Sequence, residues 1–196
     1  RGAEVRAMAT LTINGRPVVA STGASVLDAA LSAGIEIPRL CHHPELLAWG
    51  GCRLCLVEVE GQRAPVPACG LAAKEGMVVT TRSERLTALR REVLDFLLSD
   101  HPLHCVICDK AGRCDLQRYA YEFGLLDSSH EKEFSRTLYQ DDNAFFIRDH
   151  QYCISCSRCV RVCDEIVGAT AIEVSQRGFG SYIATPFDAP LVETTC

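Results

Sequence analysis

The spacing of the cysteines constrains this chain more than any other feature. The chain has 12 cysteines in 196 residues, and most of them fall into three separate sets. In a secreted domain such cysteines form a disulfide framework, whereas repeated Cys-x2-Cys spacings between regular helices and strands are typical of metal ligands. Helical and strand patterns lie between the three sets here. The cysteines are therefore predicted to bind metal.

The first set combines one close pair with two distant members: Cys41, Cys52, Cys55 and Cys69. A long loop followed by a close pair lets the chain wrap around two irons, with the last thiolate coming from a separate segment. Gly50 and Gly51 let the backbone pass close to bridging sulfides. A zinc site prefers two compact pairs. The spacing therefore favours a 2Fe-2S cluster over zinc.

The second set contains a histidine: His101, Cys105, Cys108 and Cys114. A neutral imidazole in place of a thiolate removes one negative charge from a 4Fe-4S cluster, which raises its reduction potential. The alternative is a zinc site of three cysteines, with His101 on the surface. His104 is a rival ligand, but it directly precedes Cys105 and is poorly placed to reach round a cluster. The other histidines have no ligand spacing and are interpreted as ordinary polar residues: His42, His43, His130 and His150.

The third set is a compact run: Cys153, Cys156, Cys159 and Cys163. In bacterial ferredoxins the first three thiolates of such a run bind one 4Fe-4S cluster, and the fourth binds a second. Two arrangements are open. Cys196 either completes the cubane of the first three cysteines, leaving Cys163 as a buried helix residue, or opens a second motif whose cubane also takes Cys163. The position of Cys163 favours the second arrangement, so two or three 4Fe-4S clusters are expected beside the 2Fe-2S cluster.

Composition excludes several functions. A formal net charge of -5 provides no basic stripe for nucleic acid. The longest apolar stretches are too short to span a bilayer and no signal peptide opens the chain, so a cytoplasmic protein is expected. No nucleophile–base pair, flavin motif or Gly-x-Gly-x-x-Gly fingerprint appears, so no catalytic residue is assigned. Met8 resembles a natural start and the last residue is a potential ligand, so a longer natural polypeptide is expected.

Apolar periodicity predicts α+β structure. Strands over 10–13 and 17–20 flank Asn14-Gly15, a strong hairpin signal. Ser25 can cap a helix that ends at Gly34, and strands follow over 54–59, 64–68 and 77–80.

The C-terminal half is predicted to be helical and rich in loops. A helix capped by Ser83 runs to about residue 99, and a second covers 115–123, with a cysteine-bearing loop between them. The turn and helix of 153–167 precede a hairpin-like return over 177–185. The apolar face of the first helix is predicted to comprise Leu86, Leu89, Val93, Phe96 and Leu97.

Nearly the whole chain resembles the head of the large (75 kDa-type) iron-sulfur subunit of respiratory complex I. The resemblance rests on Ile37-Pro-Arg-Leu-Cys41, Gly51-Cys-Arg-Leu-Cys-Leu-Val-Glu-Val59, Asp100-His-Pro-Leu-His-Cys105 and Gly112-Arg-Cys-Asp-Leu-Gln117. It implies an N-terminal β-grasp 2Fe-2S ferredoxin-like domain over 8–82, a helical and loop His-ligated 4Fe-4S module over 83–125, and a bacterial-ferredoxin-like 4Fe-4S module over 126–196 that is truncated at its C-terminus. Two departures are His104, where relatives carry an acidic residue, and Asp164, where two-cluster ferredoxins carry proline.

The same head occurs in NAD-linked hydrogenases, including electron-bifurcating ones, and in NAD-dependent formate dehydrogenases. The resemblance implies an electron-transfer subunit, or the N-terminal portion of one, that connects a flavin (FMN) subunit oxidising NADH to a second redox subunit or domain. Residues 142–146 and 177–179 resemble the hydrogenase and formate dehydrogenase branch, and hydrogenase ranks first. A zinc-binding structural module and a diffusible ferredoxin acting alone are the rival hypotheses.

Overall fold

The structure is a computed structural model that describes residues 8–131, 139–140, 145 and 147–195. The chain divides into two compact units. The first unit contains the residues up to 42 and 48–93, and the second contains 43–47 and the residues from 94 onward. None of the helices in the described ranges is long and apolar enough to cross a membrane.

The first unit opens with the predicted hairpin. Strand β1 (Met8–Ile13) pairs antiparallel with β2 (Arg16–Ser21). The turn residues Asn14 and Gly15 have φ values of 51° and 77°. Positive φ at both turn positions defines the type I′ turn, whose twist matches that of the strands.

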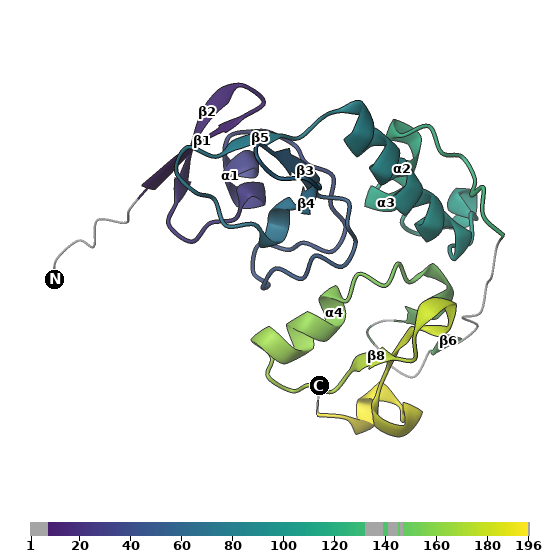
Figure 1. The fold of residues 1–196 in the computed structure, drawn as a ribbon. Helices are drawn as coiled ribbons and strands as arrows, with labels where there is room; N and C mark the ends of the chain where they lie inside the picture. Colours follow the sequence, from purple (N-terminus) through teal and green to yellow (C-terminus); the bar gives the residue numbers. More distant parts are fainter. Residues whose placement is uncertain (1–7, 132–138, 141–144, 146, 196) are drawn as a thin grey trace, which may run out of the picture. The chain divides into compact units, whose positions relative to one another are not determined.

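Three further strands extend the hairpin into a mixed sheet of order β2-β1-β5-β3-β4 (Figure 1). They are β3 (Leu56–Val59), β4 (Val66–Pro67) and β5 (Val78–Thr80). Strand β5 is parallel to β1, and the other pairs are antiparallel. The returning strand is shorter than the predicted 64–68, because the chain enters a short 3-10 helix, η1 (Ala68–Gly70), that carries Cys69.

Helix α1 (Val26–Ser32) begins where the sequence predicts. The Ser25 hydroxyl accepts a hydrogen bond from the Asp28 amide at 3.1 Å, and the Asp28 carboxylate accepts one from the Ser25 amide, also at 3.1 Å. This capping box satisfies two amides that the first helical turn leaves unpaired. Gly34 follows the helix with φ 71°, a conformation that favours glycine.

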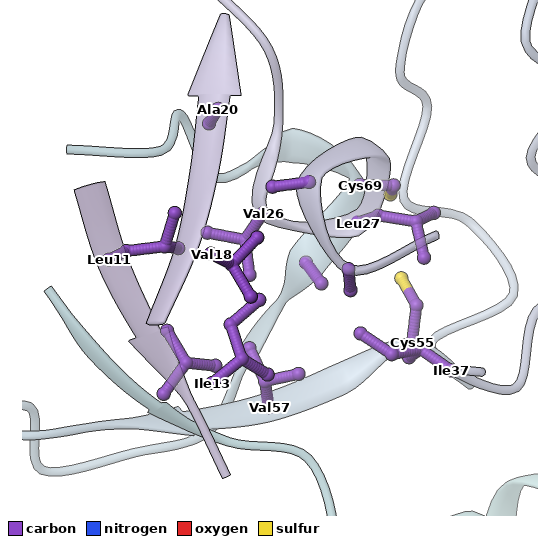
Figure 2. Packing of buried hydrophobic residues seen from close by; sticks show 14 of the residues in the cluster. Leu11, Ile13, Val18, Ala20, Val26, Leu27, Ile37, Cys55, Val57 and Cys69 are labelled. Carbon is purple, nitrogen blue, oxygen red and sulfur yellow. The ribbon is translucent and has the colours of Figure 1, made fainter. Parts of the chain in front are cut away.

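The core of the first unit joins α1 to the inner face of the sheet. Figure 2 shows side chains from β1, β2, α1 and β3 in one cluster, with Cys55 and Cys69 near Leu27 and Ile37. Two cysteines of the first set are therefore part of the hydrophobic core. The buried members are Leu11, Ile13, Val18, Ala20, Val26, Leu27, Ala29, Ala30, Ile37, Cys55, Val57, Val59, Ala68, Cys69 and Val79.

Helix α2 (Glu84–Ser99) has a different buried face from the predicted one. Leu86 is buried as expected, but Leu89 and Phe96 are exposed, and Val93 and Leu97 are half-buried. The buried residues are Leu86, Arg90, Leu94, Asp95, Leu98 and Ser99. Apolar periodicity predicts that Arg90 and Asp95 face solvent. In the structure both are buried, because each has hydrogen-bond partners there.

The second unit is built from short elements. Helix α3 (Asp115–Glu122) forms as predicted, while the turn of the third set leads into a brief helix α4 (Arg158–Arg161) that continues as a π turn over Val162–Ile166. Strands β8 (Glu173–Ser175) and β9 (Tyr182–Ala184) pair antiparallel and give the predicted return. The remaining elements are β6 (Tyr139–Gln140), β7 (Arg148–Asp149), η2 (Cys105–Ile107), η3 (His150–Tyr152), η5 (Gly178–Gly180), η6 (Pro186–Asp188) and η7 (Leu191–Glu193).

Truncating the core should destabilise the first unit. Ile13 is 0% exposed, so Ile13→Ala is expected to lower the free energy of unfolding by about 2–5 kcal/mol through lost burial and a residual cavity. Val19, on the other strand of the hairpin, is 54% exposed, and Val19→Ala should change it by no more than about 0.5 kcal/mol. Native-state hydrogen exchange of the β1 and β3 amides measures both. Equal protection in the two variants would contradict this core assignment.

Candidate metal centres

The four cysteines of the first set come together as two pairs. Cys41 follows α1, Cys52 and Cys55 precede β3, and Cys69 lies in η1. A hydrogen bond from the Cys41 thiol lowers the pKa of Cys52 to about 5, and one from Cys55 lowers the pKa of Cys69 to about 7. The donating thiols of Cys41 and Cys55 have raised pKa values for the same reason, with burial adding to the effect.

Two pairs of sulfurs match the ligand pattern of a binuclear cluster. In a 2Fe-2S cluster with four cysteine ligands, each iron takes two thiolates. The two sulfur pairs therefore fit a 2Fe-2S cluster. Across the described part of the chain, no group of three or more His, Cys, Asp or Glu side chains is arranged to hold a metal ion, in the second and third sets as well as in the first.

The loop that carries Cys52 is shaped by local packing. Gly50 has φ 69°, which favours glycine, and the Leu40 amide donates a hydrogen bond to the Cys52 sulfur at 3.4 Å. A Cβ atom on Gly51 would lie 2.1 Å from Cζ3 of the Trp49 indole. A side chain at position 51 would have to displace the Trp49 ring, which covers the Gly51 backbone, a contact that the spacing of the cysteines does not reveal.

Arg90 of α2 fixes the backbone on both sides of Cys55. Its Nε atom donates to the Leu54 carbonyl at 3.1 Å and its Nη2 atom to the Leu56 carbonyl at 2.7 Å. The Arg90 residue is only 3% exposed. These bonds satisfy two carbonyls at the start of β3 and hold Cys55 between them. Sequence reasoning missed this residue, because an arginine within an amphipathic helix is ordinarily solvent-facing.

The second set lies on the segment between α2 and α3. His101 lies two residues beyond the end of α2, and Cys105 opens η2. Cys114 is the N-cap of α3, and its sulfur accepts a hydrogen bond from the Gln117 amide at 3.5 Å. All three cysteines are half-buried. Cys114 thus lies at the N-terminus of α3 with an amide hydrogen directed at its sulfur.

His101 fits a ligand role better than its rival does. Its Nδ1 atom is buried with no hydrogen-bond partner in the described residues, and its ring makes an edge contact with Tyr152 at 5.9 Å between centroids. Burial lowers the pKa of His101, which favours the neutral imidazole that coordinates metals. His104 is exposed. A buried nitrogen without a partner is the feature expected of a metal ligand.

The loop of the third set depends on two left-handed residues. Ser155 and Ser157 have φ values of 51° and 53° and lie on either side of Cys156. Burial raises the pKa of Cys159, and the neighbouring charges of Cys153 and Cys156 raise it further. The structure thus brings the first three cysteines of this set into one electrostatic group.

Cys163 lies on the π turn that follows α4 and is 2% exposed. Its sulfur accepts a hydrogen bond from the Ala171 amide at 3.1 Å. Cys196 lies outside the described residues, as does most of the 142–146 motif, of which Phe145 is 92% exposed.

A cavity of about 480 Å³ lies beside the third set, within the usual range for ligand pockets. Three of its lining residues carry sulfur: Cys153, Cys159 and Cys163. Its wall is mainly aliphatic, with polar groups at Arg148, Asp149 and His150. The donor set and the cavity together fit a cubane cluster. Sequence reasoning missed Arg148, because a single arginine ahead of the cysteines has no distinctive spacing.

Three family models match consecutive parts of the chain. A 2Fe-2S iron-sulfur cluster binding domain matches residues 6–84, and the iron-sulfur binding region of NADH-ubiquinone oxidoreductase-G matches 90–129. The ferredoxin-like domain of NADH-quinone oxidoreductase subunit 3 matches 145–195. The chain therefore contains the 2Fe-2S and 4Fe-4S ferredoxin-like regions in the predicted order.

Curated relatives match almost all of the chain. It is 39% identical to the alpha subunit of an NADPH-Fe(3+) oxidoreductase of Geobacter sulfurreducens, over 94% of this chain and 22% of that protein. It is 38% identical to subunit HndD of an NADP-reducing hydrogenase of Solidesulfovibrio fructosivorans, over 96% of this chain and 33% of that protein. It is 42% identical to an NADH-quinone oxidoreductase subunit of Mycobacterium bovis, over 93% of this chain and 23% of that protein. The chain thus spans between a fifth and a third of the length of these relatives.

A solved structure resembles the chain over most of both lengths. A chain of an NAD+-reducing [NiFe]-hydrogenase in the H2-reduced state superposes with a TM-score of 0.88 and 34% identity. The match covers 97% of this chain and 80% of that one.

Removing the Arg90 guanidinium should weaken the first centre. Arg90→Met leaves two buried carbonyls without donors, which is expected to cost about 2 kcal/mol or more. The visible absorption of the first centre should therefore be lost at a lower temperature on heating. The neighbouring exposed Arg91 provides the control, since Arg91→Met should cost less than about 1 kcal/mol. If Arg90→Met kept its visible absorption up to the same temperature as the wild type, the role given to this side chain would be contradicted.

Proposed function

The chain belongs to the family of iron-sulfur subunits shared by complex I-type NADH-quinone oxidoreductases and NAD(P)-linked hydrogenases, and on that premise we propose that it relays electrons within a multisubunit NAD(H)-linked oxidoreductase. The observation that carries the proposal is the pairing of the four first-set sulfurs, together with the electrostatic coupling of Cys159 to Cys153 and Cys156, in regions matched by iron-sulfur family models. Such a row of redox centres within insulating protein forms a path for electrons.

The ligands follow from the three sets. We assign a 2Fe-2S cluster to the first set, Cys41, Cys52, Cys55 and Cys69, and a 4Fe-4S cluster to the second, His101, Cys105, Cys108 and Cys114. A further 4Fe-4S cluster takes Cys153, Cys156 and Cys159, and Cys163 and Cys196 belong to a second cubane or supply the fourth ligand. The two sulfur pairs, the unpartnered Nδ1 of His101 and the cavity beside Cys153 support these assignments.

The module boundaries 8–82, 83–125 and 126–196 remain our proposal, supported by family matches at 6–84, 90–129 and 145–195. The mixed sheet with α1 across it supports a β-grasp fold for the first module.

The protein residues determine how well the path works. When bound, the clusters supply one-electron carriers. The hydrophobic core around Cys55 and Cys69 keeps water from the first centre, and Arg90 fixes the position of Cys55. Neutral His101 reduces the negative charge around the second centre, which raises its potential relative to an all-thiolate site.

The partners in this proposal are an FMN-bearing subunit that oxidises NADH and a second redox subunit or domain that supplies or consumes the electrons. The similar hydrogenases and NADH-quinone oxidoreductases are named for reactions of NADP, NAD+ or NADH, which supports a nicotinamide-linked partner. We propose a cytoplasmic location and assign no substrate-converting residue to this chain.

Hydrogenase is the preferred complex. The match to an NAD+-reducing hydrogenase chain over most of both lengths supports it, as does the match to an NADP-reducing hydrogenase subunit. Formate dehydrogenase and complex I NADH dehydrogenase are the alternatives of the same class, the latter supported by the match to the NADH-quinone oxidoreductase of Mycobacterium bovis.

Metal analysis tests the proposal against a zinc-binding structural module. Protein purified without oxygen should be brown and contain iron together with acid-labile sulfide. Because each cluster has its own set of ligands, Cys69→Ser should remove the 2Fe-2S signal from the electron paramagnetic resonance (EPR) spectrum while the 4Fe-4S signals persist. Zinc in place of iron would overturn the proposal.

The choice between His101 and His104 can be tested by substitution. His101→Cys should retain a 4Fe-4S cluster but lower its potential, because a thiolate adds negative charge. His104→Ala should leave both cluster content and potential unchanged. An EPR-monitored redox titration measures the two variants. Cluster loss in His104→Ala with a normal His101→Cys protein would reverse the assignment.

A further inference from the structure

Arg148 of β7 is a half-buried residue that lines the cavity beside the third cysteine set. Its Nε, Nη1 and Nη2 atoms are all shielded from solvent, and none has a hydrogen-bond partner within the described residues. Shielding a guanidinium from solvent without hydrogen-bond partners is energetically unfavourable. Such an arrangement indicates a negatively charged acceptor nearby.

No side chain among the described residues fills this role, because none accepts a hydrogen bond from the Arg148 guanidinium. The neighbouring Asp149 also lines the cavity, and its carboxylate accepts a hydrogen bond from the Gln151 amide at 3.0 Å, as the N-cap of η3, and none from Arg148. Most of the remaining wall is aliphatic, including Ile172 and Ile183. These aliphatic side chains offer the Arg148 guanidinium nothing to bind.

The cysteines provide the missing negative charge. Cys153 and Cys159 line the same cavity as Arg148, and they belong to the set that we assign to a 4Fe-4S cluster. Thiolates and sulfides of a cluster carry net negative charge and accept N–H hydrogen bonds, which are among the factors that set its reduction potential.

We propose that Arg148 is a positioning residue for the third centre, supplying positive charge and N–H donors to the cluster bound by Cys153, Cys156 and Cys159 and raising its reduction potential. The inference rests on the proposed function, because it needs a cluster in this cavity. The sign follows from charge alone. Reduction adds one electron and therefore one negative charge, so a nearby cation stabilises the reduced form more than the oxidised form. In a cavity with aliphatic walls this effect is screened less than at the surface.

The test is an EPR-monitored redox titration of the whole protein, purified without oxygen. Arg148→Gln should lower the potential of this cluster, so that at a fixed potential the ratio of reduced to oxidised cluster falls about tenfold or more. For a one-electron couple, tenfold corresponds to about 59 mV. Arg148→Lys retains the charge with fewer donors and should shift the potential less.

Arg177 provides the matched control. It lies in the same unit and loses the same charge in Arg177→Gln, but its side chain is exposed. Solvent and salt screen an exposed charge, so this variant should titrate like the wild type. An Arg148→Gln protein with full cluster content and an unchanged potential would overturn the inference, even if its melting temperature fell.

Loss of the cluster in Arg148→Gln would still be informative. Arg148→Lys and Arg148→Met then differ mainly in charge, and retention of the cluster by Arg148→Lys alone would support the inference. Loss of the cluster in both would assign Arg148 a structural role and overturn it. Failure of the proposed function is distinguishable, because the wild type itself would then lack iron or any reducible signal.

Discussion

Placing several sulfur atoms close together inside a hydrophobic core is the constraint on which the rest of this structure depends. Thiolates repel one another and are costly to bury, so such a group needs positive charge to compensate. In the first unit, Cys55 and Cys69 lie among aliphatic side chains, and hydrogen bonds within each sulfur pair depress the pKa values of Cys52 and Cys69. Irons satisfy this need, and the two sulfur pairs suit a cluster that has two of them.

Arginines contribute to these centres in two different ways. Arg90 holds the backbone on both sides of Cys55 through hydrogen bonds to the Leu54 and Leu56 carbonyls. Arg148 lines the cavity of the third set directly, with three nitrogens that lack partners among the described residues. The first arrangement fixes geometry and the second supplies charge, so a relay of this kind can adjust each centre separately.

Local chemistry made much of the fold predictable. The Asn14-Gly15 turn and the Ser25 cap act over a few residues, and the structure has both where the sequence indicates them. The order of the cluster-binding regions also followed from cysteine spacing and is confirmed by the family models. The buried face of α2 was predicted wrongly. Arg90 can be buried because it donates to a backbone carbonyl distant in sequence, and Asp95 because it accepts hydrogen bonds from Ser128 and Ser129. Apolar periodicity within one helix gives no information about such partners.

Electron relay through this chain requires that it hold several distinct clusters, and an EPR-monitored redox titration of the wild-type protein under anaerobic conditions tests this most directly. We expect one slowly relaxing signal from the 2Fe-2S cluster, still visible at higher temperature, and at least two rapidly relaxing 4Fe-4S signals seen only on further cooling. Each should appear over its own range of potential. A spectrum without reducible signals, or with a single species that accounts for all the iron, would contradict the account.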